Sequence, residues 1–208
     1  MSRGLSVQID PLPLERVEVE LVAAGYFADQ RPLRGGAARA DWRLCAQVSN
    51  LLLDKQLTGE AGEAVLLPSG GRLRAPRVLL LGLGRRASYG LPQVQDAVRE
   101  LVLRATALGV RSLGLSGPGI VAGDFARHAE AILAGALEAM KEARRSFRLV
   151  LVLPPEEARA AARALEEAAA GLRRDVPLEL LTGAPKRRPR GVGAEHFRRV
   201  SSSLPHRD

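Results

Sequence analysis

Short apolar runs and longer stretches of helical periodicity alternate along most of the chain. Residues 5–9 and part of 17–22 alternate apolar and polar positions with a period of two, which predicts strands that have one solvated face. Residues 77–82 form a near-continuous apolar run, typical of a central strand covered on both faces. The remaining apolar runs predict four more strands, at 63–68, 111–115, 148–153 and 176–181.

Between these runs, the spacing of apolar residues predicts four helices, at 37–55, 92–108, 124–145 and 155–170. In the first of them, Trp42, Cys45, Ser49 and Leu52 share one face, which we expect to be buried. Cys45 is therefore interpreted as a packed thiol and not as a nucleophile, since no base lies near it in sequence.

Strands followed by alternating helices and strands predict an α/β fold with three layers: a mixed, mostly parallel sheet with helices on both faces. The mixed character is expected to come from antiparallel strands at the amino terminus. We predict one domain over residues 1–182 and a disordered tail over residues 183–208.

Composition narrows the function classes. One cysteine among 208 residues excludes an internal disulfide framework, and three histidines with that cysteine give no obvious zinc site. No stretch approaches the roughly 20 apolar residues that span a bilayer, and no secretory signal is recognised at the start. We therefore expect a soluble cytoplasmic protein without a metal, a cofactor or a membrane partner.

The positive charge is concentrated at the carboxyl end. The net charge is +8, and residues 182–208 alone hold seven basic and two acidic side chains. Such a segment either keeps the protein soluble or attracts polyanions such as nucleic acid. The candidate nucleic-acid contacts are Lys186, Arg187, Arg188 and Arg190.

One series of short motifs is more specific than the fold class. A helix leads into Thr58-Gly59 and Gly62-Glu63, and then a strand closes in Gly82-Leu83-Gly84. Gly109-Val110 opens a later strand, and a later helix carries a small-residue step at Ala134-Gly135. Over roughly residues 17–181 this series resembles the amino-terminal domain of the leucyl (cytosol) aminopeptidase family.

The resemblance implies a macro-domain-like fold, and in that family a separate carboxy-terminal domain carries the two catalytic metals. No match to that domain's metal-binding signature is found here, so we do not expect an enzyme. The family's amino-terminal domain projects from a hexameric core, and some bacterial members bind DNA. We therefore expect a non-catalytic interaction module whose partner is a protein, a copy of itself or nucleic acid. The alternatives are a macro-like binder of ADP-ribose or another nucleotide, and a regulatory subunit of a full-length aminopeptidase.

Two loops are candidate anion sites. Residues 116–123 join a strand end to a helix start, where backbone N–H groups can converge on a diphosphate, as in macro domains. The alternative is a tight turn that needs glycine for its backbone. Arg85 and Arg86 follow another strand and either bind a phosphate or are simply solvated. His128 is interpreted as a histidine at the edge of a helix stripe. The candidate residues of the first loop are Ser116, Gly117, Gly119, Ile120 and Gly123.

Overall fold

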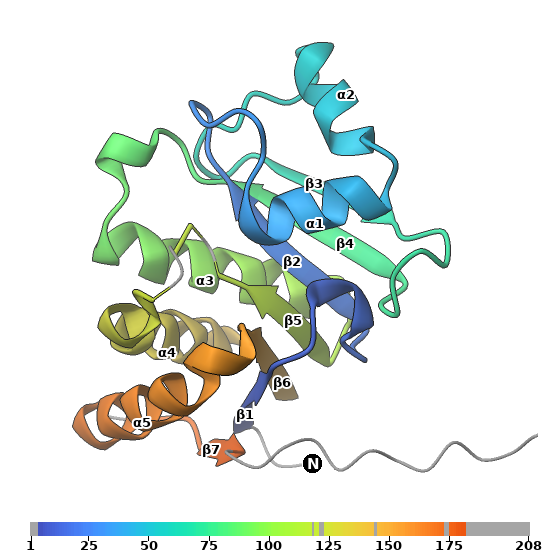
Figure 1. The fold of residues 1–208 in the computed structure, drawn as a ribbon. Coiled ribbons are helices and arrows are strands. Elements are labelled where there is room, and N and C mark those ends of the chain that lie inside the picture. Colours follow the sequence, from blue (N-terminus) through green and yellow to red (C-terminus); the bar gives the residue numbers. More distant parts are fainter. Residues whose placement is uncertain (1–3, 118, 121–122, 144, 173–174, 182–208) are drawn as a thin grey trace, which may run out of the picture.

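A computed structural model of the chain describes residues 4–117, 119–120, 123–143, 145–172 and 175–181. In this part of the chain, seven strands form one sheet in the order β3-β4-β2-β5-β6-β1-β7 (Figure 1). The strands are β1 (Gly4–Asp10), β2 (Leu21–Tyr26), β3 (Ala64–Pro68), β4 (Arg77–Gly82), β5 (Ser112–Ser116), β6 (Ser146–Val152) and β7 (Leu178–Leu181). The α-helices are α1 (Gly35–Arg43), α2 (Gln47–Leu53), α3 (Leu91–Ala107), α4 (Phe125–Glu142) and α5 (Pro155–Gly171), with 3-10 turns at Leu14–Arg16 and Arg86–Ser88.

The sheet is mixed and mostly parallel, as predicted, but its antiparallel strand is not at the amino terminus. β1 runs parallel to both β6 and β7, and β2 runs parallel to both β4 and β5. Among the described strands, only β3 is antiparallel to its neighbour, β4. The expectation for the amino-terminal strands was therefore wrong. A short connection over residues 69–76 joins β3 to β4, and such a hairpin reverses the chain direction.

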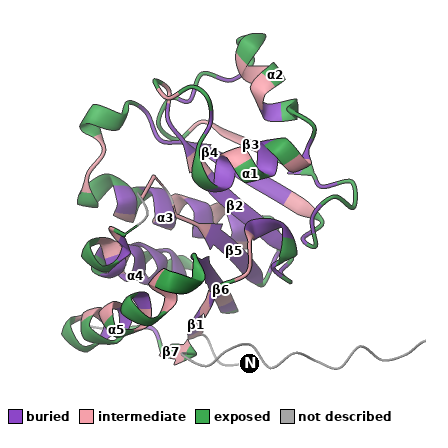
Figure 2. Ribbon diagram, viewed as in Figure 1, coloured by how far each residue is buried: buried purple, intermediate pink, exposed green. Residues whose placement is uncertain are grey.

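Helices cover both faces of the sheet (Figures 1 and 2). Helices α3, α4 and α5 pack on one face, around a core that includes Leu101, Ile132 and Phe147. Helix α1 lies on the other face, over a second core that includes Val22 and Leu80. The three-layer α/β architecture predicted from the alternation is confirmed.

The second strand lies four residues later than its polar–apolar alternation suggested. Residues 17–20 keep that alternation, with Val17 and Val19 buried and Glu18 and Glu20 exposed, but they do not pair in the sheet. The strand begins at Leu21 and is buried along nearly its whole length. A strand covered on both faces has no polar side chains, and so the period of two is lost where pairing begins.

The predicted helix over residues 37–55 is two helices, α1 and α2. Cys45 and Ala46 have left-handed backbones, with φ of 56° and 63°, and they end the regular helical path. The carboxylate of Asp41 then accepts hydrogen bonds from the first turn of α2, at 2.8 Å from Val48 N and 3.0 Å from Ser49 N. Asp41 thus supplies the cap that Ala46 lacks a side chain to provide.

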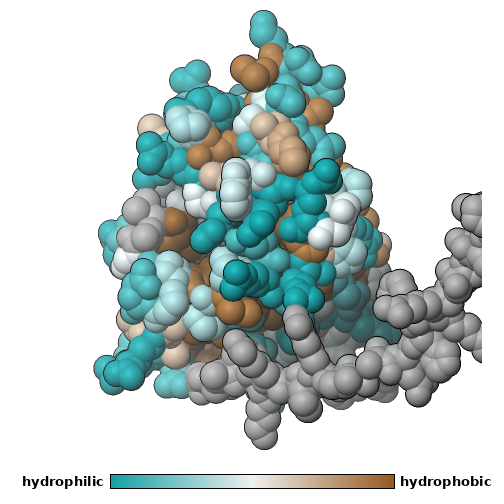
Figure 3. All heavy atoms as spheres, turned by 45° about the vertical axis from the view of Figure 1, so that its right-hand side comes forward, coloured by the Kyte–Doolittle hydropathy of each residue, from teal (hydrophilic) through white to brown (hydrophobic). Residues whose placement is uncertain are grey.

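The break in the helix overturns the prediction of a buried stripe. Of the four residues of that stripe, Trp42 is 70% exposed and Cys45 is exposed, whereas Ser49 and Leu52 are half-buried. Leu53, the next residue on α2, is 79% exposed. Two left-handed residues rotate the second helix relative to the first, so positions that one continuous helix would align point in different directions. Apolar atoms accordingly reach the surface in the upper region where α2 lies (Figure 3).

The threonine–glycine and glycine–glutamate motifs are joined by hydrogen bonds to the side chain of Glu63, a set of contacts that we call the Glu63 staple. The Glu63 carboxylate accepts hydrogen bonds from Gly59 N at 2.6 Å, from Thr58 N at 2.9 Å and from the Tyr26 hydroxyl at 3.0 Å. Gly59 adopts φ +88°, and a Cβ atom there would lie 2.7 Å from Ala28 Cα. The staple therefore attaches the 57–63 loop to the end of β2.

The small-residue step on α4 lets two helices touch. A Cβ atom on Gly135 would lie 2.3 Å from the carbonyl oxygen of Gln95 on α3. Close approach of the two backbones at this point aligns Arg99 of α3 with Glu142 of α4, at 2.8 Å. The glycine at position 135 is therefore explained by helix packing.

Candidate cleft at the carboxyl ends of the parallel strands

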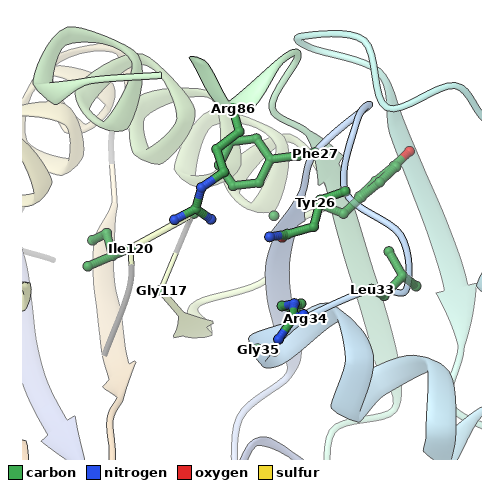
Figure 4. Close-up of a pocket in the computed structure, with 12 residues that line it drawn as sticks. Tyr26, Phe27, Leu33, Arg34, Gly35, Arg86, Gly117 and Ile120 are labelled. Atoms are coloured by element: carbon green, nitrogen blue, oxygen red, sulfur yellow. The ribbon is translucent and has the colours of Figure 1, made fainter. Parts of the chain in front are cut away.

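A cavity of about 510 Å³ opens at the carboxyl ends of β2 and β5. In open parallel sheets this edge is where ligands bind, because loops on either side diverge and leave a crevice. Its walls come from the loop after β2, the start of α1, the turn after β4 and the loop after β5 (Figure 4). The cavity is lined by Gly25, Tyr26, Phe27, Gln30, Leu33, Arg34, Gly35, Gly36, Arg86, Gly117, Gly119 and Ile120.

Two glycines place the start of α1 at this cavity. Gly35 has φ +57° and no neighbour within 4 Å of the position of a Cβ atom. Gly36 packs tightly, since its Cβ would lie 2.6 Å from Ser116 Oγ. No side chain caps this end of the nine-residue helix. Its first backbone N–H groups are therefore available to an anion, with the positive end of the helix dipole behind them.

Two arginines bring formal positive charge to the same cavity. Arg86 comes from the turn after β4, and its guanidinium points toward Gly117 and Ile120 (Figure 4). Its Cζ lies 5.6 Å from the centre of the Phe27 ring. Arg34 directly precedes α1. Within the described ranges, neither arginine has a carboxylate partner.

An aromatic wall fixes the backbone of the loop after β5. Phe27 and Tyr89 meet edge to face, with ring centres 5.1 Å apart. Gly119 lies against both rings, and a Cβ atom there would be 2.7 Å from Phe27 Cζ and 2.8 Å from Tyr89 Cε1. Burial raises the pKa of Tyr89, so its hydroxyl stays protonated. Glycine at position 119 is thus required by packing and by its φ of +73°.

A second compartment of about 470 Å³ continues past Gly35, Gly36, Gly117 and Ile120, which line both spaces. Its far wall is largely apolar and is made by Pro11, Leu12, Pro13, Leu14, Phe125, Val152, Leu153, Pro154 and Pro155. The polar side chains at its edge are Ser116, Arg39 and Glu157.

Arg39 is held at this edge by a buried carboxylate. Glu15 Oε1 lies 3.7 Å from Arg39 and 3.0 Å from Arg43. Burial acts to raise the pKa of Glu15, but its backbone hydrogen bond and the two arginines outweigh that effect and lower it. Glu15 therefore remains ionised and orients both cations.

The structure brings most of the predicted loop residues to the cleft. Gly119 and Arg86 line the first compartment, Ser116 lines the second, and Gly117 and Ile120 line both. Gly123 and Arg85 line neither of them. Lys186, Arg187, Arg188 and Arg190 lie outside the described residues, as does the whole predicted tail.

His128 is half-buried, and its Nδ1 lies 2.7 Å from the carbonyl oxygen of Asp124. This contact within one helix turn accounts for the histidine without a ligand.

Arg34, Gly35 and Gly36 also line the cavity, and they were not among the predicted site residues. The sequence feature that could have indicated them is an arginine followed by two glycines, directly before the first helix. The two glycines directly precede residue 37, where the apolar spacing predicts that a helix begins, and so in the sequence they indicate only a helix boundary.

The described residues contain no cluster of three or more His, Cys, Asp or Glu side chains that could hold a metal ion. None of their helices is long and apolar enough to cross a membrane.

The fold is that of a macrodomain-like α/β domain. A structure of a tomato leucine aminopeptidase mutant superposes with a TM-score of 0.58 at 19% identity, covering 81% of this chain and 37% of that one. The macrodomain of Trypanosoma brucei, solved in complex with ADP, superposes with a TM-score of 0.55 at 13% identity, covering 80% of this chain and 69% of that one. At these identities the likeness is one of fold.

Comparison of sequences identifies the family to which the chain belongs. Residues 23–145 match the N-terminal domain of the cytosol aminopeptidase family, and the chain belongs to that family. A probable cytosol aminopeptidase of Rippkaea orientalis is 28% identical over 123 residues, which are 59% of this chain and 25% of that protein. The chain thus spans about a quarter of this relative's length, and the part matched is not the catalytic domain.

Proposed function

We propose that the chain is a cytoplasmic, non-catalytic binding domain whose cleft takes a phosphate-bearing ligand of the nucleoside diphosphate class, ADP-ribose included. The observation that carries this proposal is the convergence of Arg34, Arg86 and the uncapped start of α1 on one glycine-lined cavity. Guanidinium groups and helix N-termini both bind phosphate oxygens in proteins.

The dimensions and polarity of the cleft support a ligand of this kind. Compartments of about 510 and 470 Å³ lie within the range of pockets that enclose small molecules. Two arginines line the first compartment, and the second combines a largely apolar far wall with Arg39, Ser116 and Glu157 at its edge. A ligand with phosphates and a flat ring matches this combination of charge and apolar surface. The Trypanosoma brucei macrodomain of the same fold was solved with ADP.

The cleft favours binding over chemistry. Among the described residues that line the first compartment there is no aspartate, glutamate, histidine, cysteine or serine. Those side chains supply most nucleophiles and general bases in enzymes. Its arginines are suited to hold an anion, and its glycine backbone is suited to approach one closely.

Arg86 and Arg85 provide a matched pair of variants. Both are exposed and adjacent in sequence, but only Arg86 lines the cavity. Loss of one hydrogen-bonded charge costs about 1.5–3 kcal/mol, so Arg86→Ala should weaken binding roughly 10- to 150-fold. Arg85→Ala should change affinity little. Gly119→Val is unsuitable because it disturbs the packing of Phe27 and Tyr89.

Isothermal titration calorimetry with ADP-ribose, ADP and adenosine measures these affinities directly. We expect binding of the two diphosphates and much weaker binding of adenosine, which lacks the anion. At 100 times its dissociation constant a ligand stabilises the fold by about 2.7 kcal/mol, which raises the melting temperature by roughly 5–10 °C. No heat with either diphosphate, or equal weakening by Arg85→Ala and Arg86→Ala, would refute the proposal.

A further inference from the structure

The edge strand β3 presents an open row of backbone hydrogen-bonding groups. Among the described strands β3 pairs with β4 alone, and the hydrogen bonds from Gly82 N to Glu63 O and from Ser69 N to Pro76 O fix which residues of β3 bond to β4. In an antiparallel pair every second residue bonds to the neighbouring strand. The backbone groups of Ala64, Leu66 and Pro68 therefore point away from β4, toward the outside of the sheet.

This edge lacks the features with which proteins usually prevent pairing. Its sequence, Ala-Val-Leu-Leu-Pro, contains no charge, and Leu66 at its centre is 40% exposed. Natural edge strands are normally protected by lysines, bulges, inward-pointing charges or a covering element. Pro68 is the one protective residue, and it removes a single N–H donor at the end of the strand.

We propose that two copies of this chain associate through antiparallel pairing of β3 with β3, on a two-fold axis at Leu66. In this register the two Leu66 residues exchange two backbone hydrogen bonds. Each Ala64 N–H donates to the Pro68 carbonyl of the other copy, and each Ala64 carbonyl stays with water because Pro68 has no N–H to donate. The two Leu66 side chains lie directly opposite each other on the same face of the joined sheet. This inference is independent of the cleft.

Charge at the two ends of β3 matches the same arrangement. Glu60 lies in the loop before β3 and Arg72 lies in the turn after it, and both are exposed. Neither forms an ion pair with another described residue. Antiparallel pairing puts the acidic end of one strand beside the basic end of the other. The strand is thus complementary to itself only in the antiparallel direction, as an isologous two-fold interface requires.

Sedimentation velocity of the full chain over a range of concentrations tests the proposal. We expect a monomer–dimer equilibrium. Leu66→Lys should raise the dimer dissociation constant more than tenfold, because it sets like charges opposite each other at the axis. Leu53→Lys is the matched control, since Leu53 is more exposed but lies on α2. Melting curves at dilute, monomeric concentration establish that both variants are folded.

A charge exchange tests the register. Glu60→Arg alone and Arg72→Glu alone should each weaken the dimer, and the double variant should restore it. Three results would overturn the proposal: a monomer at all soluble concentrations, a dimer that survives Leu66→Lys, or a double variant weaker than both single ones. Because ligand binding is measured separately with Arg86→Ala, a failure here leaves the proposed function intact, and the converse also holds.

Discussion

Replacing Glu63 by glutamine should destabilise the fold through the staple at the end of β2. The carboxylate accepts from Gly59 N at 2.6 Å, Thr58 N at 2.9 Å and the Tyr26 hydroxyl at 3.0 Å. Each lost hydrogen bond to a charged group costs about 1.5–3 kcal/mol. The loss is partly offset because the amide oxygen of glutamine still accepts some of these hydrogen bonds and because water can reach the loop. We expect a net loss of about 2 kcal/mol, or roughly 4–8 °C in melting temperature.

The effect should depend on pH. Burial acts to raise the pKa of Glu63, but the hydrogen bonds from Gly59, Thr58 and Tyr26 outweigh it, so the folded-state pKa is lowered. A lowered pKa means that the stabilisation is complete above the unfolded-state pKa of about 4.3 and is lost as pH falls through the folded-state value. The stability gap between the natural chain and the glutamine variant should therefore narrow on acidification.

Urea unfolding followed by circular dichroism, repeated from neutral pH to about pH 3, measures this gap. Glu130→Gln, a change at an exposed position on α4, is the control and should behave like the natural chain. The reasoning fails if Glu63→Gln is as stable as the natural chain at neutral pH, or if the gap stays constant down to the acid limit.

Two further expectations concern α4 and the carboxyl-terminal segment. Gly135→Ala should destabilise the fold by about 1–3 kcal/mol because the new methyl group meets the Gln95 carbonyl, whereas Gly171→Ala, with open space around it, should be neutral or slightly stabilising in the same unfolding assay. If residues 183–208 bind duplex DNA, affinity measured by fluorescence anisotropy should fall with salt at a log–log slope near −3 to −4, from about four neutralised phosphates, and truncation after residue 182 should abolish it. Full-strength binding by the truncated chain would move the DNA site to the folded body.

Regular features of the fold could be predicted from the sequence, because burial imposes a period on it. Helix α3 and strand β4 follow their apolar patterns closely. The break between α1 and α2 could not be predicted this way, since no glycine or proline marks it. At the break, the Asp41 carboxylate accepts hydrogen bonds from the backbone N–H groups of Val48 and Ser49. The spacing of apolar residues does not reveal such a contact.

Only part of the cleft could be predicted, because contacts between distant segments leave no pattern in the sequence. Gly117 and Gly119 directly follow a clearly predicted strand, so the sequence indicates a loop there. Arg34 and Gly35 are adjacent to that loop only in space, because β2 and β5 are neighbours in the sheet although about 90 residues separate them. Sequence reasoning could also not distinguish Arg85 from Arg86, since the direction of each side chain is set by the turn after β4.

The position of β1 determines when the domain can be completed during synthesis. The first strand lies between β6 and β7, whose residues emerge from the ribosome more than 130 residues later. Until then the amino-terminal strand has no permanent partner, and a nascent chain that ends at residue 145 has β5 exposed at a sheet edge. Such late, long-range closure is slow and aggregation-prone compared with local pairing. A truncated expression product limited to the family match of 23–145 would stay in that unfinished state.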